Sequence, residues 1–158
     1  MLCVNKVKKG FHTGIVKKSV IIYASEGKVW KKIGNIIGLP SWVKDVKQTV
    51  YASKIKNGVG AIRKITFNDN STIEEHVVAW KPREHFTYIA TEGLPLRAYV
   101  ATISMEKKSN NKIKITWKSY INSKKMTKAK FMEFLNFMEL FYAESLNNLK
   151  LSLEKKDR

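Results

Sequence analysis

The feature that most constrains the fold is an amphipathic segment near the end of the chain. Between about Lys125 and Leu153, apolar residues recur at spacings of three and four, which places them on one face of a helix. The face consists of Phe131, Phe134, Leu135, Met138, Tyr142, Leu146, Leu149 and Leu153. A helix of about 27 residues is roughly 40 Å long at 1.5 Å per residue. Such a helix needs a large apolar surface to cover it, and a curved antiparallel sheet provides one.

The segments before this helix show the alternation of such a sheet. Residues 112–121 are the clearest case, with apolar side chains and Ser119 on one side and lysines on the other, which is typical of a strand with one buried and one solvated face. Two short helices are expected after the first strand, one opened by Ser25 and a second that Ser41 caps and that runs through Trp42 and Val46. The other strands are expected at about 14–23, 48–53, 61–67, 73–79, 85–91 and 97–105. The predicted fold is therefore α+β, with about seven antiparallel strands wrapped around the long C-terminal helix.

A hairpin between residues 58 and 80 carries charge on its inward face. Period-two alternation places Arg63 among apolar residues of one strand and Glu75 among those of the next. A three-residue loop at 68–70 sets Arg63 opposite Glu75. A buried ion pair is costly, so it indicates a cavity that holds something partly polar. A structural cross-strand pair is the alternative interpretation.

Length and composition fit a single domain over residues 14–154, preceded by a basic lead-in at 1–13 that can be flexible. The chain has 158 residues, and no apolar run approaches the roughly 20 that a membrane-spanning helix requires. No signal-peptide core is visible, and Cys3 is the one cysteine, so a disulfide framework and a cysteine zinc site are not expected. These features favour the cytoplasm.

The net charge of +17 invites a nucleic-acid interpretation but does not require one. Lysines greatly outnumber arginines among the 30 basic residues, and arginine is the residue preferred for bidentate phosphate and base contacts. The lysines are also scattered along nearly the whole chain, as compositional bias alone would place them. Both a compositional and a functional origin of the charge stay open.

The ordered set of motifs resembles the START-like or SRPBCC superfamily, in particular its polyketide cyclase/dehydrase-like branch. The segments that carry the resemblance lie at 24–30, 42, 58–63, 72–76, 97–99, 115–117 and 146–150. The resemblance covers about residues 15–153 and implies a helix-grip fold with an apolar cavity between the sheet and the long helix. It further implies a hydrophobic ligand such as a lipid, quinone or polyketide. Some members are cyclases and one branch acts on ribosomes, so the fold alone does not define a reaction.

Candidate ligand-binding residues follow from the inward faces of these elements. Arg63 and Glu75 are the polar pair, and aromatic side chains with a polar tip suit an apolar pocket with few hydrogen-bonding groups. Trp42 and the loop 94–96 are expected at the entrance, and the helix forms the other wall. The full candidate set is Trp42, Arg63, Glu75, Tyr88, Tyr99, Trp117, Phe131, Phe134, Met138 and Tyr142. Ordinary core packing is the alternative for every aromatic and helical residue in it.

Catalytic signatures are scarce. The three histidines, His12, His76 and His85, have no metal-ligand spacing, and no nucleophile elbow or phosphate-binding loop is present. No cofactor or metal is expected, and no catalytic residue is assigned. If the protein is an enzyme, Arg63 stabilises an enolate while Glu75 or Tyr99 moves a proton.

The sequence therefore favours a non-catalytic binding or carrier protein for a small hydrophobic ligand with a polar head. Alternatives are an aromatase/cyclase-type enzyme and an RNA- or ribosome-associated module. The basic exterior is expected to favour anionic ligands, an anionic membrane surface or RNA. Replacing Arg63 by Met is expected to weaken binding of an acidic ligand and to leave the fold intact. Oligomeric state is not defined.

Overall fold

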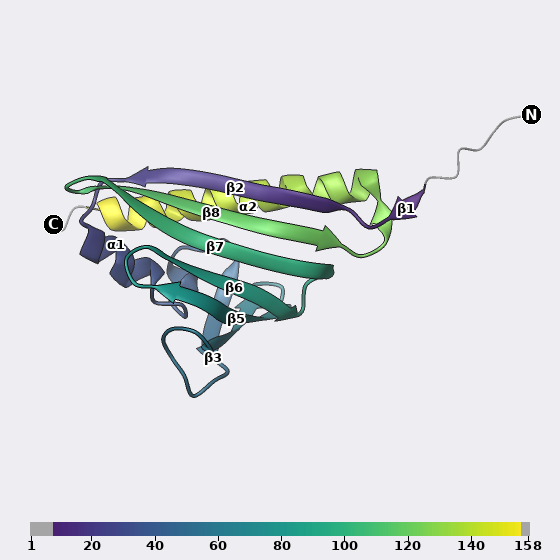
Figure 1. Ribbon diagram of the computed structural model, residues 1–158, viewed down its shortest axis with the longest axis horizontal. Helices are drawn as coiled ribbons and strands as arrows, with labels where there is room; N and C mark the ends of the chain where they lie inside the picture. Colours follow the sequence, from purple (N-terminus) through teal and green to yellow (C-terminus); the bar gives the residue numbers. More distant parts are fainter. Residues whose placement is uncertain (1–7, 156–158) are drawn as a thin grey trace, which may run out of the picture.

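The computed structural model describes residues 8–155, and its centre is a seven-stranded antiparallel sheet (Figure 1). The strands lie in the order β2-β8-β7-β6-β5-β4-β3, so one connection, from β2 to β3, crosses from one edge to the other. Their bounds are β2 (Thr13–Ile22), β3 (Val46–Tyr51), β4 (Ile62–Phe67), β5 (Thr72–Lys81), β6 (His85–Glu92), β7 (Leu96–Ser109) and β8 (Lys112–Ser123). The predicted α+β class and strand number are confirmed.

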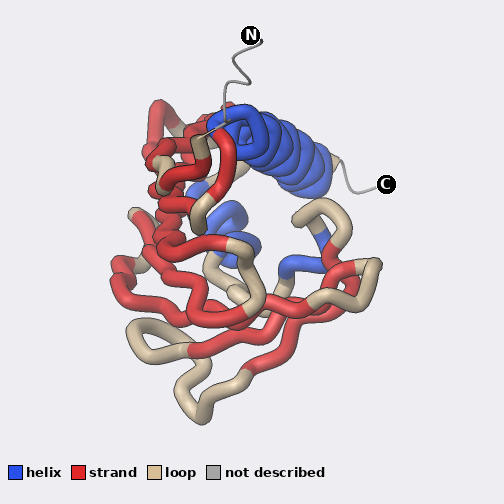
Figure 2. Tube along the Cα trace, turned by 90° about the vertical axis from the view of Figure 1, so that its right-hand side faces the viewer, coloured by secondary structure: helices blue, strands red, loops and turns tan. Residues whose placement is uncertain are grey.

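The long helix α2 (Lys128–Glu154) lies across the concave side of this sheet, which curves around and beneath it (Figure 2). The hydroxyl of Thr127 caps its first turn by accepting a hydrogen bond from the backbone N–H of Lys130 at 3.2 Å. The helix approaches β2 closely at Gly14, where an added Cβ would lie 2.9 Å from the Leu135 side chain. The helix therefore rests on β2 and β8 and leaves the opposite half of the sheet less closely covered.

The crossover between β2 and β3 contains one α-helix, not the two that the sequence predicts. Helix α1 (Glu26–Ile33) is capped by Ser25 as expected, but a three-residue 3-10 turn, η1 (Leu39–Ser41), stands where the second helix was predicted. The Ser41 hydroxyl donates to the Gly38 carbonyl at 2.7 Å and does not cap a helix. Strand β3 already begins at Val46, so no room remains for further helical turns.

The predicted lead-in is partly paired. Strand β1 (Lys9–Gly10) forms a two-stranded antiparallel sheet with β9 (Met126–Thr127), just before α2 begins. Residues 1–7 of the lead-in lie outside the described residues. Among the helices of the described part of the chain, none is long and apolar enough to cross a membrane.

Candidate ligand cavity

The hairpin formed by β4 and β5 has the register expected from its sequence. Arg63 pairs with Glu75 across the two strands, and the backbone N–H of Phe67 donates to the Ser71 carbonyl at 2.9 Å. The turn residue Asn70 adopts a positive φ of 66°, which asparagine tolerates better than most residues. The loop length thus directs both charged side chains to the concave, helix-facing side of the sheet.

Arg63 and Glu75 form a buried ion pair. Their exposed fractions are 2% and 5%. Arg63 Nε donates to Glu75 Oε1 at 2.9 Å, and Nη2 lies 2.8 Å from the same oxygen in an ion pair. Arg63 Nη1 donates to the carbonyl oxygen of Ile36 at 2.9 Å, and the guanidinium lies 4.7 Å from the centre of the Tyr88 ring. Burial raises the pKa of the Glu75 carboxyl, and the nearby Arg63 charge opposes that rise. The pair therefore places hydrogen-bonding groups in surroundings that exclude water.

Buried hydroxyl groups continue this polar cluster. The indole N–H of Trp117 donates to the Tyr88 hydroxyl at 2.9 Å, and the hydroxyl groups of Tyr99 and Tyr142 are hydrogen-bonded to each other. The Trp117 and Tyr142 rings stack with their centres 3.9 Å apart. Burial raises the pKa of all three tyrosines, so they remain protonated donors at neutral pH.

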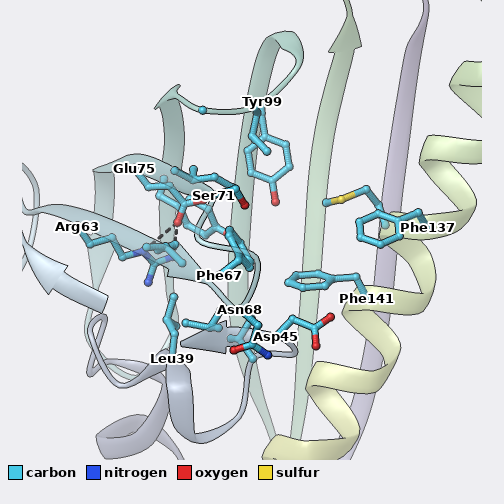
Figure 3. A pocket seen from close by; sticks show the side chains of 18 of the residues that line it. Leu39, Asp45, Arg63, Phe67, Asn68, Ser71, Glu75, Tyr99, Phe137 and Phe141 are labelled. Carbon is cyan, nitrogen blue, oxygen red and sulfur yellow. Dashed lines mark hydrogen bonds and ion pairs between the residues drawn. The ribbon is translucent and has the colours of Figure 1, made fainter. Parts of the chain in front are cut away.

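These groups border a cavity of about 510 Å³ between the sheet, the crossover and α2. Figure 3 shows Arg63 and Glu75 on the side of the cavity opposite Phe137 and Phe141, which project from α2. The wall is mostly apolar and comprises Leu39, Trp42, Val43, Asp45, Val46, Arg63, Ile65, Phe67, Asn68, Asp69, Ser71, Ile73, Glu75, Tyr88, Gly93, Leu94, Pro95, Tyr99, Ile103, Trp117, Phe134, Phe137, Met138 and Phe141. The residues of this wall thus come from both the sheet and α2.

The structure brings most of the predicted site residues to this wall. Those that line it are Trp42, Arg63, Glu75, Tyr88, Tyr99, Trp117, Phe134 and Met138. Phe131 does not line it, because it lies where α2 meets the N-terminal segment and stacks on His12 at 5.4 Å. Tyr142 also does not, since it packs behind Trp117.

Trp42 has a different position from the one predicted. The loop residues Leu94 and Pro95 line the cavity, but Trp42 is only 2% exposed and therefore cannot stand at its entrance. Its indole N–H has no hydrogen-bond partner among the described residues. An unpaired buried donor is costly, but this N–H is fully buried and is not exposed to the cavity, so it offers no contact to a ligand in this structure.

Several lining residues were missed by sequence reasoning. Phe137 and Phe141 extend the apolar stripe of α2 beyond the predicted face, and their spacing from Phe134 was a usable signal. The mouth residues Asp45, Asn68, Asp69 and Ser71 gave no such signal, because they are ordinary turn residues.

Neither the cavity nor the rest of the described chain offers an obvious metal centre. No three His, Cys, Asp or Glu side chains within residues 8–155 form a group that could hold an ion. His76 pairs with Glu74 at 3.0 Å on the other side of β5, and His12 contacts the Met126 carbonyl at 2.9 Å. The cavity's own side chains offer hydrogen bonding and charge at Arg63 and Glu75.

The fold and cavity define a helix-grip protein with a ligand-sized interior. A family model described as polyketide cyclase/dehydrase and lipid transport matches residues 13–154, and the chain belongs to this family. No curated protein matches the chain.

Several solved structures share the fold. An uncharacterised protein from Bacillus thuringiensis is 21% identical, with a TM-score of 0.77 over 90% of this chain and 100% of its own. XoxI from Bacillus cereus is 22% identical, with a TM-score of 0.76 over 89% and 95%. The ZhuI aromatase/cyclase from Streptomyces sp. R1128 is 13% identical, with a TM-score of 0.77 over 93% and 97%. At these identities the likeness establishes the fold alone.

Proposed function

We propose that this protein binds or carries a small hydrophobic ligand with a polar head, such as a lipid, quinone or polyketide-like molecule. The observation that carries the proposal is the cavity of about 510 Å³, whose apolar wall contains a small number of converging polar groups. Ligand sites of drug-sized molecules are typically about 300–1,000 Å³ and have this composition. Membership of a family whose description includes lipid transport supports the same interpretation.

Affinity would come from burial of the ligand's apolar body, at about 25 cal/mol per Å² before the costs of binding. Orientation would come from the buried ion pair in the wall. Arg63 and Glu75 offer a donor and an acceptor to the polar head of the ligand.

Native mass spectrometry of gently purified protein, followed by organic extraction, tests this proposal. A defined hydrophobic passenger is expected in the wild type. The variant Ile73→Trp enlarges a side chain of the cavity wall and should lose the passenger. The control Val78→Trp changes an exposed residue of the same strand that does not line the cavity, and it should retain the passenger. Equal passenger content in both folded variants would contradict binding in this cavity.

An aromatase/cyclase-type enzyme is the second candidate, because a buried carboxyl of raised pKa lies close to buried tyrosine hydroxyls. In that case Glu75→Gln or Tyr99→Phe should abolish turnover of a polyketide substrate and leave binding largely intact. A carrier would show no turnover with either the wild type or the variants.

A further inference from the structure

The buried ion pair of the cavity leaves one of its two carboxylate oxygens unused. Arg63 Nε donates to Glu75 Oε1 at 2.9 Å, and Nη2 lies 2.8 Å from the same oxygen. Within residues 8–155, no side chain or backbone group donates a hydrogen bond to the other oxygen, Oε2. A carboxylate can accept about four hydrogen bonds, so much of the acceptor capacity of Glu75 is free.

This free oxygen is open to the cavity. The fully enclosed side-chain atoms that lack a partner in the described part of the chain belong to Trp42, Thr49 and Ser119, and Glu75 Oε2 is not one of them. The Glu75 side chain is 7% exposed, and the residue lines the cavity. Oε2 is therefore an unpaired acceptor in the inner wall, on a residue that is otherwise enclosed.

Arg63 does not offer a donor to the same extent. Each of its three side-chain nitrogens already has a protein oxygen within 2.9 Å, since Nη1 donates to the Ile36 carbonyl. Its side chain is 3% exposed, and the guanidinium lies 4.7 Å from the centre of the Tyr88 ring. The ion pair thus presents its acceptor to the cavity more openly than its donor.

The charge of the pair restricts what can approach this acceptor. Arg63 and Glu75 offset each other, so a ligand that brings a charge of its own would bury that charge without compensation. A carboxylate would also meet the negative charge of Glu75, and an ammonium group would meet the positive charge of Arg63. An uncharged hydroxyl avoids both costs and can donate to Oε2, and hydrogen bonds to a charged group are stronger than those between neutral groups.

From this arrangement we infer that the polar head of the ligand is an uncharged hydroxyl group, of an alcohol or a phenol, which donates a hydrogen bond to Glu75 Oε2. The inference rests on the proposed function and deepens it, because it names the class of ligand. A long-chain alcohol or a quinol fits, whereas an ionised fatty acid does not, and a quinone offers only acceptors. The net charge of +17 would by itself favour the fatty acid.

Calorimetric titration with octanol, methyl heptyl ether and octanoate tests the inference. Octanol and methyl heptyl ether are isomers with similar apolar bodies, but only octanol has a hydroxyl donor. We expect octanol to bind about tenfold more tightly than the ether, because only octanol can donate to Oε2. Octanoate should bind most weakly of the three.

The variant Glu75→Gln reverses the hydrogen-bonding character of this position. Its amide oxygen can accept from Arg63, which leaves the amide N–H₂ toward the cavity as a donor. The preference for octanol over the ether should disappear. Arg63→Met/Glu75→Leu removes both charges together and should lose the same preference.

Glu74→Gln is the matched control, because Glu74 is the preceding residue of β5, pairs with His76 and does not line the cavity. It should keep the wild-type preference. Three results would each overturn the hydroxyl assignment: wild-type protein that binds the ether as tightly as octanol, octanoate as the tightest probe, or a preference for octanol that persists in the folded Glu75 variants. The proposed cavity function would still stand on binding of the ether. If none of the three probes binds, the cavity function and the inference are overturned together.

Discussion

Replacing Arg63 by Met tests the energetic role of the buried pair, and the structure changes the result expected from the sequence alone. Because Glu75 is 5% exposed, the substitution leaves a buried carboxylate without its partner. Breaking a buried pair in this way typically costs about 3–5 kcal/mol. The Ile36 carbonyl also loses its donor. We therefore expect Arg63→Met to lower the free energy of unfolding by about 4 kcal/mol at pH 7, not to leave stability intact.

Denaturant unfolding followed by tryptophan fluorescence measures this loss. The double variant Arg63→Met/Glu75→Leu should recover most of the lost stability, because it removes the unpaired charge as well as its partner. Lys64→Met is the matched control: Lys64 is exposed and occupies the next position of β4, so its replacement should change the free energy of unfolding by less than about 0.5 kcal/mol.

The loss of stability in Arg63→Met should become smaller as pH falls. Burial already raises the pKa of Glu75 above its ordinary value of 4.5, and removal of Arg63 raises it further. A carboxyl whose pKa is raised in the folded state favours folding below the unfolded-state pKa, and this contribution is lost as pH rises through the folded-state pKa. The deficit of Arg63→Met should thus narrow as pH falls toward about 4. The reasoning would be refuted if Arg63→Met lowered the free energy of unfolding by less than about 1 kcal/mol at pH 7, or if its difference from the wild type grew as pH falls.

Three further predictions concern backbone and burial. Gly93→Ala should lower the free energy of unfolding by about 2 kcal/mol in denaturant unfolding. Gly93 has a φ of 95°, and an added Cβ would overlap the Thr72 carbonyl. The control Gly10→Ala should leave stability nearly unchanged, because no atom lies within 4 Å of an added Cβ there. Thr127→Ala removes the N-cap of α2 and should cost about 1 kcal/mol, seen as a lower midpoint of unfolding; an unchanged midpoint would show that the cap is dispensable. Three buried tyrosines have a raised pKa in the folded state, so they ionise above pH 10 only on unfolding, and stability should fall by up to about 4 kcal/mol per pH unit there. The buried three are Tyr88, Tyr99 and Tyr142. The assay uses the variant Tyr23→Phe/Tyr51→Phe/Tyr120→Phe, which removes the other three of the chain's six tyrosines. Tyrosinate absorbance that develops in this variant while it is still folded would contradict the burial of the remaining three.

Local pattern was sufficient for the elements whose signals lie close together in the chain. The periodicity of apolar residues predicted α2 to within about three residues at each end, and alternation with a three-residue loop placed Arg63 opposite Glu75. Local signals failed in the crossover, where Ser41 resembled a helix cap. There the hydroxyl bonds to the Gly38 carbonyl, and the early start of β3 takes the residues that a second helix would need.

The sequence by itself determined which face of each element is apolar, because side-chain direction repeats with a period set by the backbone. Only the tertiary structure decided which part of each face is covered and which part lines the cavity. Phe131 and Phe137 lie on one helix, yet Phe131 is buried beside His12 and Phe137 stands at the cavity mouth. The same holds for charge. Lysines are scattered along the sequence, but within residues 8–155 none lines the cavity, whereas the exposed Asp45 and Asp69 do. Contacts between distant segments set these positions, and a single sequence carries no local signal of them.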